Sequence, residues 1–405
     1  MASSLARRTA EALLRAGGRR HLARFDRLAP ARCQTRILLG LLHQAQATQF
    51  GRERDFRRIR TVADYRRLVP LCTRAELWRD YWQPVYPHLA GATWPGSTTH
   101  RRTDAGDSVR LTPPSSELQT AHRSALHTAF ALAGHVRPQL RLLDGTLLSL
   151  ADEGPSNRTE CAVLAERLPA LIRPFTEASA DLRVERWANL PVSVLHGPAE
   201  RLLSLMEQVK QARGKRCLRD VWPMLAAIVY TRRLSSSAAR FRSEVGEDVL
   251  LLEMVGRAEG PLAIEDPRYG SLRLLFDHGV YFEFVPPGQA GELRCPRYGI
   301  DDIELDVPYE LAVSSPAGLW ACRLNRTVCL EQRDPPLVRF VETPLPQSAV
   351  PAVPVAPRRT RRTDLAIGAL TQPHSLELHP RSADSPAAPL ENAFHSPWSI
   401  RADRG

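Results

Sequence analysis

The spacing of apolar residues predicts helices in the N-terminal part of the chain. Residues 31–48 place their apolar side chains on one helical face, at Ile37, Leu38, Leu41, Leu42 and Ala45. An amphipathic stretch before this predicts a first helix that is capped by Ser4 and ends at Gly17-Gly18. Thr61 followed by Asp64 has the pattern of a capping box and predicts a short helix, and residues 116–134 predict a longer one.

From residue 249 onward, apolar runs of strand length alternate with glycine and proline. The runs occupy residues 249–252, 272–276, 281–285, 309–314, 327–330 and 337–341. Earlier in the chain, residues 192–195 predict a strand that leads through Gly197-Pro198 into a helix. Asp144-Gly145 predicts the turn of a hairpin over residues 140–150. Mixed helices and strands of this kind predict an α/β fold.

The composition of the chain changes after Thr343. Residues 344–405 are rich in proline, alanine, serine and arginine, a composition that cannot bury enough apolar area to offset the entropy of an ordered chain. We therefore expect three parts: N-terminal helices over residues 1–96, an α/β domain over residues 97–343 and a disordered tail over residues 344–405.

Charge and cysteine usage narrow the possible functions. The 405 residues carry a formal charge of +11, and Lys210 and Lys215 are the only lysines, so nearly all the basic residues are arginines. Since these arginines are spread along the chain without interleaved aromatic residues, we predict no nucleic-acid partner. No apolar run is long enough to cross a bilayer, and the N-terminus lacks the apolar core of a signal peptide. Seven scattered cysteines without metal-type spacing are typical of a reduced, cytoplasmic protein without membrane partners.

The most specific pattern lies in residues 34–96. Gln34 precedes the apolar helical face, and Thr48-Gln49-Phe50-Gly51-Arg52, Val69-Pro70-Leu71 and Trp94-Pro95-Gly96 follow in order. This order and spacing resemble the acyl acid amido synthetases, the auxin-responsive Gretchen-Hagen group and its bacterial relatives in the adenylate-forming superfamily. The resemblance implies a large adenylate-forming domain with an N-terminal helical clasp. It also implies use of ATP and Mg²⁺ to join a carboxylic acid to an amino acid.

In that family the Trp-Pro-Gly stretch leads into a Ser/Thr/Gly-rich loop whose backbone binds the phosphates of ATP. The segment that begins at Arg110 resembles the family sequence after this loop and places the loop at residues 101–107. Here the chain has Arg101 and Arg102 followed by Asp104 and Asp107. The aspartates would repel phosphate, so the candidate nucleotide-binding residues of this part are Arg101, Arg102 and Arg110.

A second family motif, Tyr-Gly-Ala-Ser-Glu-Gly, packs against adenine and supplies a magnesium-binding glutamate. Residues 255–260 resemble it and match at Gly256, Glu259 and Gly260. The resemblance makes the two glycines candidate nucleotide-binding residues and makes Glu259 the candidate catalytic and metal-binding carboxylate. A Glu-Gly pair after a strand is also a common turn, which leaves a purely structural alternative for Glu259.

A third resemblance covers Tyr309-Glu310-Leu311 and residues 318–326, where Arg323 is a further candidate nucleotide-binding residue. The family's ribose-binding aspartate aligns with Arg326, which can only donate hydrogen bonds. Residues 336–341 match a family strand that continues into the hinge of a mobile C-terminal lid domain. Because the proline-rich tail follows here, we expect no such lid.

These departures predict a degenerate, C-terminally truncated acyl acid amido synthetase-like protein that has lost catalysis. The leading hypothesis is a non-catalytic scaffold, or a binder of a small carboxylic acid or a protein partner, without a cofactor. One alternative is a residual ATP-dependent acid–amino acid ligase that forms an acyl-adenylate with ATP and Mg²⁺. Another is a gene that is decaying or frameshifted near residue 343. No nucleophile elbow, P-loop or Rossmann glycine fingerprint indicates a different reaction.

Overall fold

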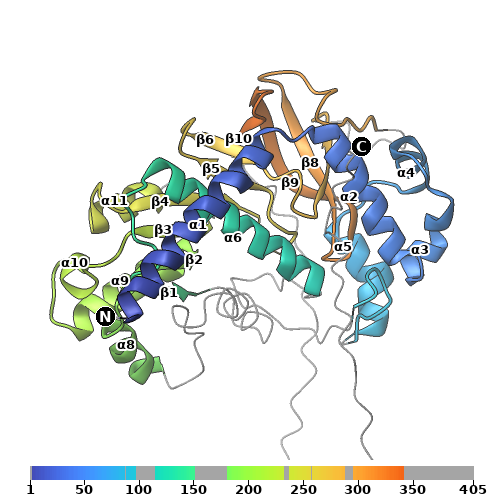
Figure 1. The fold of residues 1–405 in the computed structure, drawn as a ribbon. Coiled ribbons are helices and arrows are strands. Elements are labelled where there is room, and N and C mark those ends of the chain that lie inside the picture. The colour runs from blue at the N-terminus through green and yellow to red at the C-terminus, as the bar shows by residue number, and fades with distance from the viewer. Residues whose placement is uncertain are drawn as a thin grey trace, which may run out of the picture. The chain divides into compact units, whose positions relative to one another are not determined.

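A ten-stranded sheet organises the part of the chain that the structure describes (Figure 1). The computed structural model describes residues 2–86, 88–96, 115–150, 180–231, 237–256, 258–287 and 295–341. These residues belong to one compact unit, Met1–Val353. The strand order is β1-β2-β3-β4-β5-β6-β10-β9-β8-β7. This mixed architecture confirms the predicted α/β fold, whereas the predicted disordered tail lies outside the described residues.

One half of the sheet is parallel. It comprises β1 (Thr146–Ser149), β2 (Val192–Pro198), β3 (Ala227–Thr231) and β4 (Leu250–Val255). Parallel neighbours need crossover connections, and these contain α9 (Ala199–Ala212), α10 (Leu218–Val221) and α11 (Ser237–Val245). Another helix, α8 (Ala180–Ala188), precedes β2. Successive side chains of each strand enter different apolar layers: Ile228 packs with α9, and Val229 packs with α6 (Ser116–Val136).

The other half of the sheet is antiparallel. It comprises β5 (Ala263–Asp266), β6 (Ser271–Leu274), β10 (Leu337–Val341), β9 (Leu319–Gln332), β8 (Pro308–Ser315) and β7 (Tyr281–Val285). The sequence predicted the bounds of β7 and β10 correctly and located β2, β4, β6, β8 and part of β9. It missed β3 and β5, which are short and are recognised only by the neighbours with which they pair.

The N-terminal helices share an apolar core with the antiparallel half. They are α2 (Pro30–Ala45), α3 (Gln49–Glu53), α4 (Val62–Leu68) and α5 (Arg74–Leu77), with the short turns η1 (Phe56–Arg58), η2 (Trp78–Trp82) and η3 (Gln83–Val85). The predicted apolar face of α2 is buried throughout. The predicted capping box between Thr61 and Asp64 is also present and opens α4. Among the described helices, none is both long enough and apolar enough to span a bilayer.

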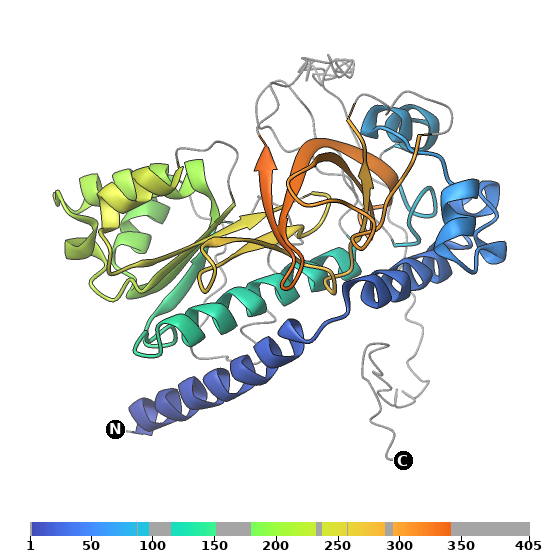
Figure 2. The same ribbon diagram turned by 90° about the horizontal axis from the view of Figure 1, so that it is seen from above.

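The first helix is longer than predicted. α1 (Ala2–Asp26) continues through Gly17-Gly18, so the predicted end at these glycines is wrong. Its C-terminal half lies beside α6 (Figures 1 and 2). A Cβ atom on Gly18 would lie only 3.3 Å from the Cα of Ala131. Gly18 therefore permits close helix–helix packing, which outweighs the cost of a glycine inside a helix, roughly 1 kcal/mol.

The hairpin predicted for residues 140–150 is wrong. All of these residues are described, but only β1 forms a strand, and it pairs in parallel with β2. The N–H of Thr146 donates to the carbonyl of Pro191 at 2.7 Å. A Cβ atom on Gly145 would lie 2.3 Å from the same carbonyl oxygen. The glycine is thus needed for a close approach between two distant segments, not for a tight turn.

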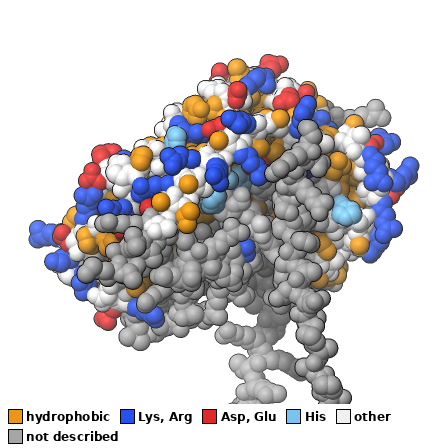
Figure 3. Space-filling view, viewed as in Figure 1, with side chains coloured by type: hydrophobic (Ala, Val, Ile, Leu, Met, Phe, Trp, Pro, Cys, Tyr) orange, Lys and Arg blue, Asp and Glu red, His pale blue; other side chains and the backbone are white. Residues whose placement is uncertain are grey.

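The surface charges of the described residues are mixed rather than segregated. In Figure 3 acidic side chains lie among the basic side chains across the visible face. Several arginines also form ion pairs inside the fold. Arg66 and Arg297 both pair with the buried carboxylate of Glu283. Arg268 and Arg273 likewise pair with Asp26 at the end of α1.

The side-chain amide of Gln34 joins α2 to the antiparallel half of the sheet. Its Nε2 donates to the carbonyls of Phe276 and Val280, both at 2.9 Å. Its Oε1 accepts from the N–H of Phe282 at 2.7 Å. Gln34 is 5% exposed, so water does not readily replace these bonds.

We predict that Gln34→Ala lowers the free energy of unfolding by at least about 2 kcal/mol, because three buried backbone groups lose their partners. Urea unfolding followed by circular dichroism measures the change. The control is Gln211→Ala, since Gln211 is exposed and its side-chain amide donates to Glu207 Oε1 at 2.9 Å in an amide–carboxylate bond. The control should change the free energy by less than about 0.5 kcal/mol. Equal effects of the two substitutions would contradict the role of Gln34.

Histidines lie between α1, α6 and the loop after β6. His21 and His278 contact the hydroxyl of Thr128 through their Nε2 atoms, at 2.8 and 3.0 Å. Burial, together with the neighbouring His127 and His278, lowers the pKa of His21 to about 4. Nearby Asp277 opposes this shift, and Arg24 adds to it. His21 is therefore neutral in the folded protein at neutral pH.

We predict a loss of stability on acidification that depends on His21. The unfolded chain protonates His21 near pH 6.5, whereas the folded chain does so only near pH 4. The contribution of neutral His21 to stability is therefore complete above about pH 6.5 and falls as the pH decreases toward 4. Melting temperatures measured across this range should fall less steeply for His21→Asn. The exposed His43 provides the control, because His43→Asn should retain the wild-type slope.

Candidate functional site

The turn between β4 and β5 contains the matched residues Gly256, Glu259 and Gly260. Gly256 has φ +101° and Gly260 has φ +113°, both in the region that favours glycine. A Cβ atom on Gly256 would lie 2.2 Å from the carbonyl oxygen of Gly260, and one on Gly260 would lie 2.7 Å from Cγ2 of Val280. Both positions therefore require glycine. The tight turn leaves Glu259 only 3% exposed.

A bulge in β9 brings Arg326 next to this turn. Glu310 of β8 pairs with Thr327, and Ala312 pairs with Arg323, so residues 324–326 of β9 stand opposite a single residue of β8. Within the bulge Asn325 has φ +52°, a left-handed conformation that asparagine tolerates better than most residues. Bulges change the direction in which side chains point. Arg326 Nη2 lies 3.4 Å from Glu259 Oε1.

The ion pair between Arg326 and Glu259 sets the charge at the site. The Glu259 side chain is 4% exposed and that of Arg326 is 33% exposed. A buried carboxylate is costly unless a cation neutralises it. Arg326 supplies that cation, and it does so from the position where the resembling family has its ribose-binding aspartate. The sequence identified Arg326 as a replacement but did not show its partner.

Arg323, the predicted nucleotide-binding arginine, forms a cross-strand ion pair. Its Nε lies 3.0 Å from Glu310 Oε1, and its Nη2 lies 2.7 Å from Glu310 Oε2. Such bidentate pairing occupies one edge of the guanidinium. The sequence did not predict a role for Glu310 beyond its place in the motif. The remaining predicted residues, Arg101, Arg102 and Arg110, lie outside the described residues.

The residues flanking segment 97–114 are both anchored at the start of α6. On the N-terminal side, Trp94 is 1% exposed, and its Nε1 donates to Glu117 Oε2 at 3.3 Å. On the C-terminal side, Ser115 caps α6 by accepting from the N–H of Leu118 at 3.0 Å. The Ser115 hydroxyl also donates to the carbonyl of Pro316 at 2.7 Å, between β8 and β9. The fold thus holds both flanks of the predicted phosphate-loop segment at one helix N-terminus.

The described residues do not fit a magnesium–nucleotide centre as they are arranged. The one carboxylate that the resemblance assigns to magnesium, Glu259, faces a guanidinium. A divalent cation at that carboxylate would have to displace Arg326 or be repelled by it. Among the described residues, no group of three or more His, Cys, Asp or Glu side chains is arranged to hold a metal ion. The ribose acceptor is also replaced by a donor at position 326.

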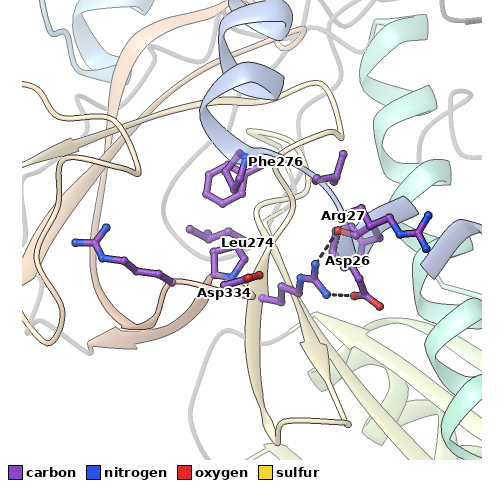
Figure 4. Close-up of a pocket in the computed structure, with 11 residues that line it drawn as sticks. Asp26, Arg27, Leu274, Phe276 and Asp334 are labelled. Carbon is purple, nitrogen blue, oxygen red and sulfur yellow. Dashed lines mark hydrogen bonds and ion pairs between the residues drawn. The ribbon is translucent and has the colours of Figure 1, made fainter. Parts of the chain in front are cut away.

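A separate pocket of about 320 Å³ lies between the end of α1, strand β6 and the turn that joins β9 to β10 (Figure 4). Leu274 and Phe276 provide apolar walls, and Asp26, Arg27 and Asp334 provide charged ones. Asp26 is engaged by Arg273 at 2.6 Å, shown by a dashed line in Figure 4. The pocket shares no residue with the turn at Glu259, so it is distinct from the candidate site.

Comparison with known families identifies two segments of the chain. Residues 23–80 match the GH3 family N-terminal domain, and residues 273–342 match the GH3 family central domain. Two segments of the chain therefore resemble domains of the GH3 family. This confirms the resemblance to acyl acid amido synthetases. The turn at residues 256–260 lies outside both matched segments. No curated protein matches the chain.

Solved structures share the fold at low sequence identity. An AtGH3.15 acyl acid amido synthetase in complex with 2,4-DB superposes with a TM-score of 0.59 and 13% identity over 77% of this chain and 67% of that protein. A 2-hydroxyisobutyryl-CoA ligase in an open conformation, in complex with 2-HIB-AMP and CoA, gives a TM-score of 0.54 and 13% identity over 75% of this chain and 71% of that one. The GH3 part of the chain therefore has the adenylate-forming fold.

We predict that Arg326 and Glu259 are energetically coupled. In a double-mutant cycle with Arg326→Ala and Glu259→Gln, the interaction energy should be about 1 kcal/mol or more, because the carboxylate is buried. The control cycle uses the surface pair of Arg339 and Glu331, whose atoms lie 3.1 Å apart and whose side chains are 55% and 34% exposed. Its coupling should be below about 0.5 kcal/mol. Chemical unfolding of the wild type and the six variants measures both coupling energies, and equal coupling in the two cycles would contradict the burial argument.

Proposed function

We propose that this chain is a degenerate acyl acid amido synthetase-like protein that binds a small carboxylic acid and does not adenylate it. The observation that carries the proposal is the ion pair between Arg326 and Glu259. Where the resembling family holds magnesium and ribose, this chain holds a neutralised pair of its own side chains. The acid-binding function of the family needs neither group, so it can persist when the nucleotide chemistry is lost.

The guanidinium groups of Arg326 and Arg74 have the chemistry to bind a carboxylate ligand. Arg326 is partly exposed and has five N–H donors, of which the contact with Glu259 uses only some. Arg74, at the start of α5, has a buried Nη1 atom without a hydrogen-bond partner among the described residues. Helix α5 packs against β9, where the neighbouring Cys72 thiol and the charge of Arg74 lower the pKa of the Cys322 thiol. Guanidinium groups bind carboxylates through paired, charge-assisted hydrogen bonds.

The known relatives make a carboxylic acid the natural ligand class. The AtGH3.15 synthetase is in complex with 2,4-DB, and the CoA ligase is in complex with the adenylate 2-HIB-AMP. We extend only the acid-binding part of these activities to the present chain. In this proposal residues 1–96 clasp the α/β domain of residues 97–343, and the acid binds between Arg326 and Arg74.

A residual ATP-dependent ligase is the second candidate. The observation that favours it is the turn at Gly256 and Gly260, where both glycines have the positive φ angles that the motif requires. In this case the acid would react with ATP to give an acyl-adenylate and pyrophosphate. Glu259 would have to exchange Arg326 for magnesium before ATP could bind productively.

We predict that the full chain binds carboxylic acids but shows no magnesium-dependent binding of ATP. Calorimetry with ATP, with and without Mg²⁺, tests the nucleotide, and a thermal-shift screen of aryloxyalkanoic and short hydroxy acids tests the ligand. Arg326→Ala should weaken acid binding by about tenfold, which corresponds to 1.4 kcal/mol. Arg339→Ala removes a surface guanidinium and should leave the affinity unchanged.

The possible results separate the candidates. Magnesium-dependent ATP binding with acid-dependent release of pyrophosphate would establish the residual ligase. A cooperatively folded chain that binds neither acids nor ATP would leave the scaffold or protein-partner function. Acid binding that is equally strong in Arg326→Ala and wild type would place the ligand elsewhere in the protein.

A further inference from the structure

Cys72 and Cys322 come from distant parts of the chain and are directly paired. Cys72 lies between α4 and α5, and Cys322 lies on β9. The N–H of Cys72 donates to the carbonyl of Ala321 at 3.1 Å, and the N–H of Arg323 donates to the carbonyl of Cys72 at 2.8 Å. These two bonds form a parallel bridge with Cys72 opposite Cys322. Both cysteines are free thiols.

This pairing satisfies the distance requirement of a disulfide. Directly paired strands lie about 4.8 Å apart, and disulfides join residues whose Cα atoms are about 4.4–6.8 Å apart. Side chains at paired positions project from the same face of the bridge. Each thiol is also the first cause of the change in the pKa of the other thiol.

The two thiols have opposite chemical character. The neighbouring Cys72 thiol, aided by the charge of Arg74, lowers the pKa of the Cys322 thiol against the effect of burial. The Cys322 thiol in turn raises the pKa of Cys72, and burial raises it further. Cys322 is therefore the more readily deprotonated of the two thiols. A thiolate next to a second thiol is the arrangement from which disulfides form.

We propose that Cys72 and Cys322 form a reversible redox site, oxidised to a disulfide by a low-molecular-weight disulfide such as oxidised glutathione. Cys72 is partly exposed and Cys322 is buried, so the oxidant meets Cys72 first. Cys72 attacks one sulfur of the oxidant while its thiol proton passes to the departing glutathione, which leaves as a thiol. The Cys322 thiolate then attacks the Cys72 sulfur and releases the second glutathione. The protein loses two electrons and two protons, and the oxidant gains them.

The bond would join the N-terminal helices covalently to the strand that carries Arg326. Without it, the bridge depends on two backbone hydrogen bonds and on the contact of the Cys72 thiol with the carbonyl of Trp320, at 3.1 Å. The inference concerns thiol chemistry and fold stability, so it does not depend on acid binding. It can be tested without any activity assay.

The experiment is peptide mapping of the full-length protein after incubation in glutathione buffers of increasing oxidised fraction. Free thiols are alkylated at the end of each incubation, before proteolysis and mass spectrometry. We expect a cross-linked peptide pair containing Cys72 and Cys322, lighter by two hydrogens, that disappears again in reduced glutathione. We also expect the melting temperature of the oxidised protein to rise by roughly 5 °C, because the cross-link closes a long loop.

Variants separate this site from other thiols. Cys72→Ser and Cys322→Ser should each abolish the cross-linked pair and the rise in melting temperature. Cys217→Ser removes an exposed thiol and should retain both. Mixed glutathione adducts on Cys72 without the cross-link, or a cross-link that forms only in denaturant, would overturn the proposal. The wild-type peptide map decides this even if a serine variant does not fold.

Discussion

The amide of Gln34 is the contact on which the candidate site depends. It binds the backbone at Phe276, Val280 and Phe282 and so determines where the loop after β6 lies. That loop supports the glycine turn in two ways. The N–H of Leu275 donates to the carbonyl of Leu262 at 2.9 Å, and Val280 packs against Gly260. A single buried side chain on an N-terminal helix thereby positions the turn that presents Glu259, more than two hundred residues away.

Buried carboxylates in the fold form ion pairs with arginines, several of which come from distant segments of the chain. Glu283 is paired by Arg66 and Arg297, and Glu259 is paired by Arg326. Asp26 is exposed but is likewise paired by Arg268 and Arg273; although burial acts to raise the pKa of Asp26, the hydrogen bonds from these arginines lower it overall. The excess of arginine has the composition of a polyanion-binding surface. Ion pairs between arginines and carboxylates within the fold account for part of this excess. At Glu259 the cation that faces the carboxylate is a side chain, which supports the proposed loss of the family's metal chemistry.

Local signals in the sequence predicted elements whose cause is local. The apolar face of α2, the capping box at Thr61 and the strands β7 and β10 depend on side-chain spacing or on hydrogen bonds between near neighbours. The errors have the opposite origin. Gly17-Gly18 and Gly145 looked like chain breaks, but they are sites of close contact with Ala131 and Pro191, residues far along the chain. A glycine has the same local signature in a turn and in a tight contact, so only the partner distinguishes the two.

The sequence by itself determined the family resemblance and the α/β class, and it singled out Gly256, Glu259, Gly260 and Arg326, because motif order and residue chemistry are properties of the chain. The tertiary structure decided how these residues are used. The pairing of Arg326 with Glu259 requires a bulge in β9 and a left-handed Asn325, and the pairing of Cys72 with Cys322 requires a bridge between segments that are about 250 residues apart. Neither arrangement has a local signature, since each arises from the register between segments that meet only in the folded protein.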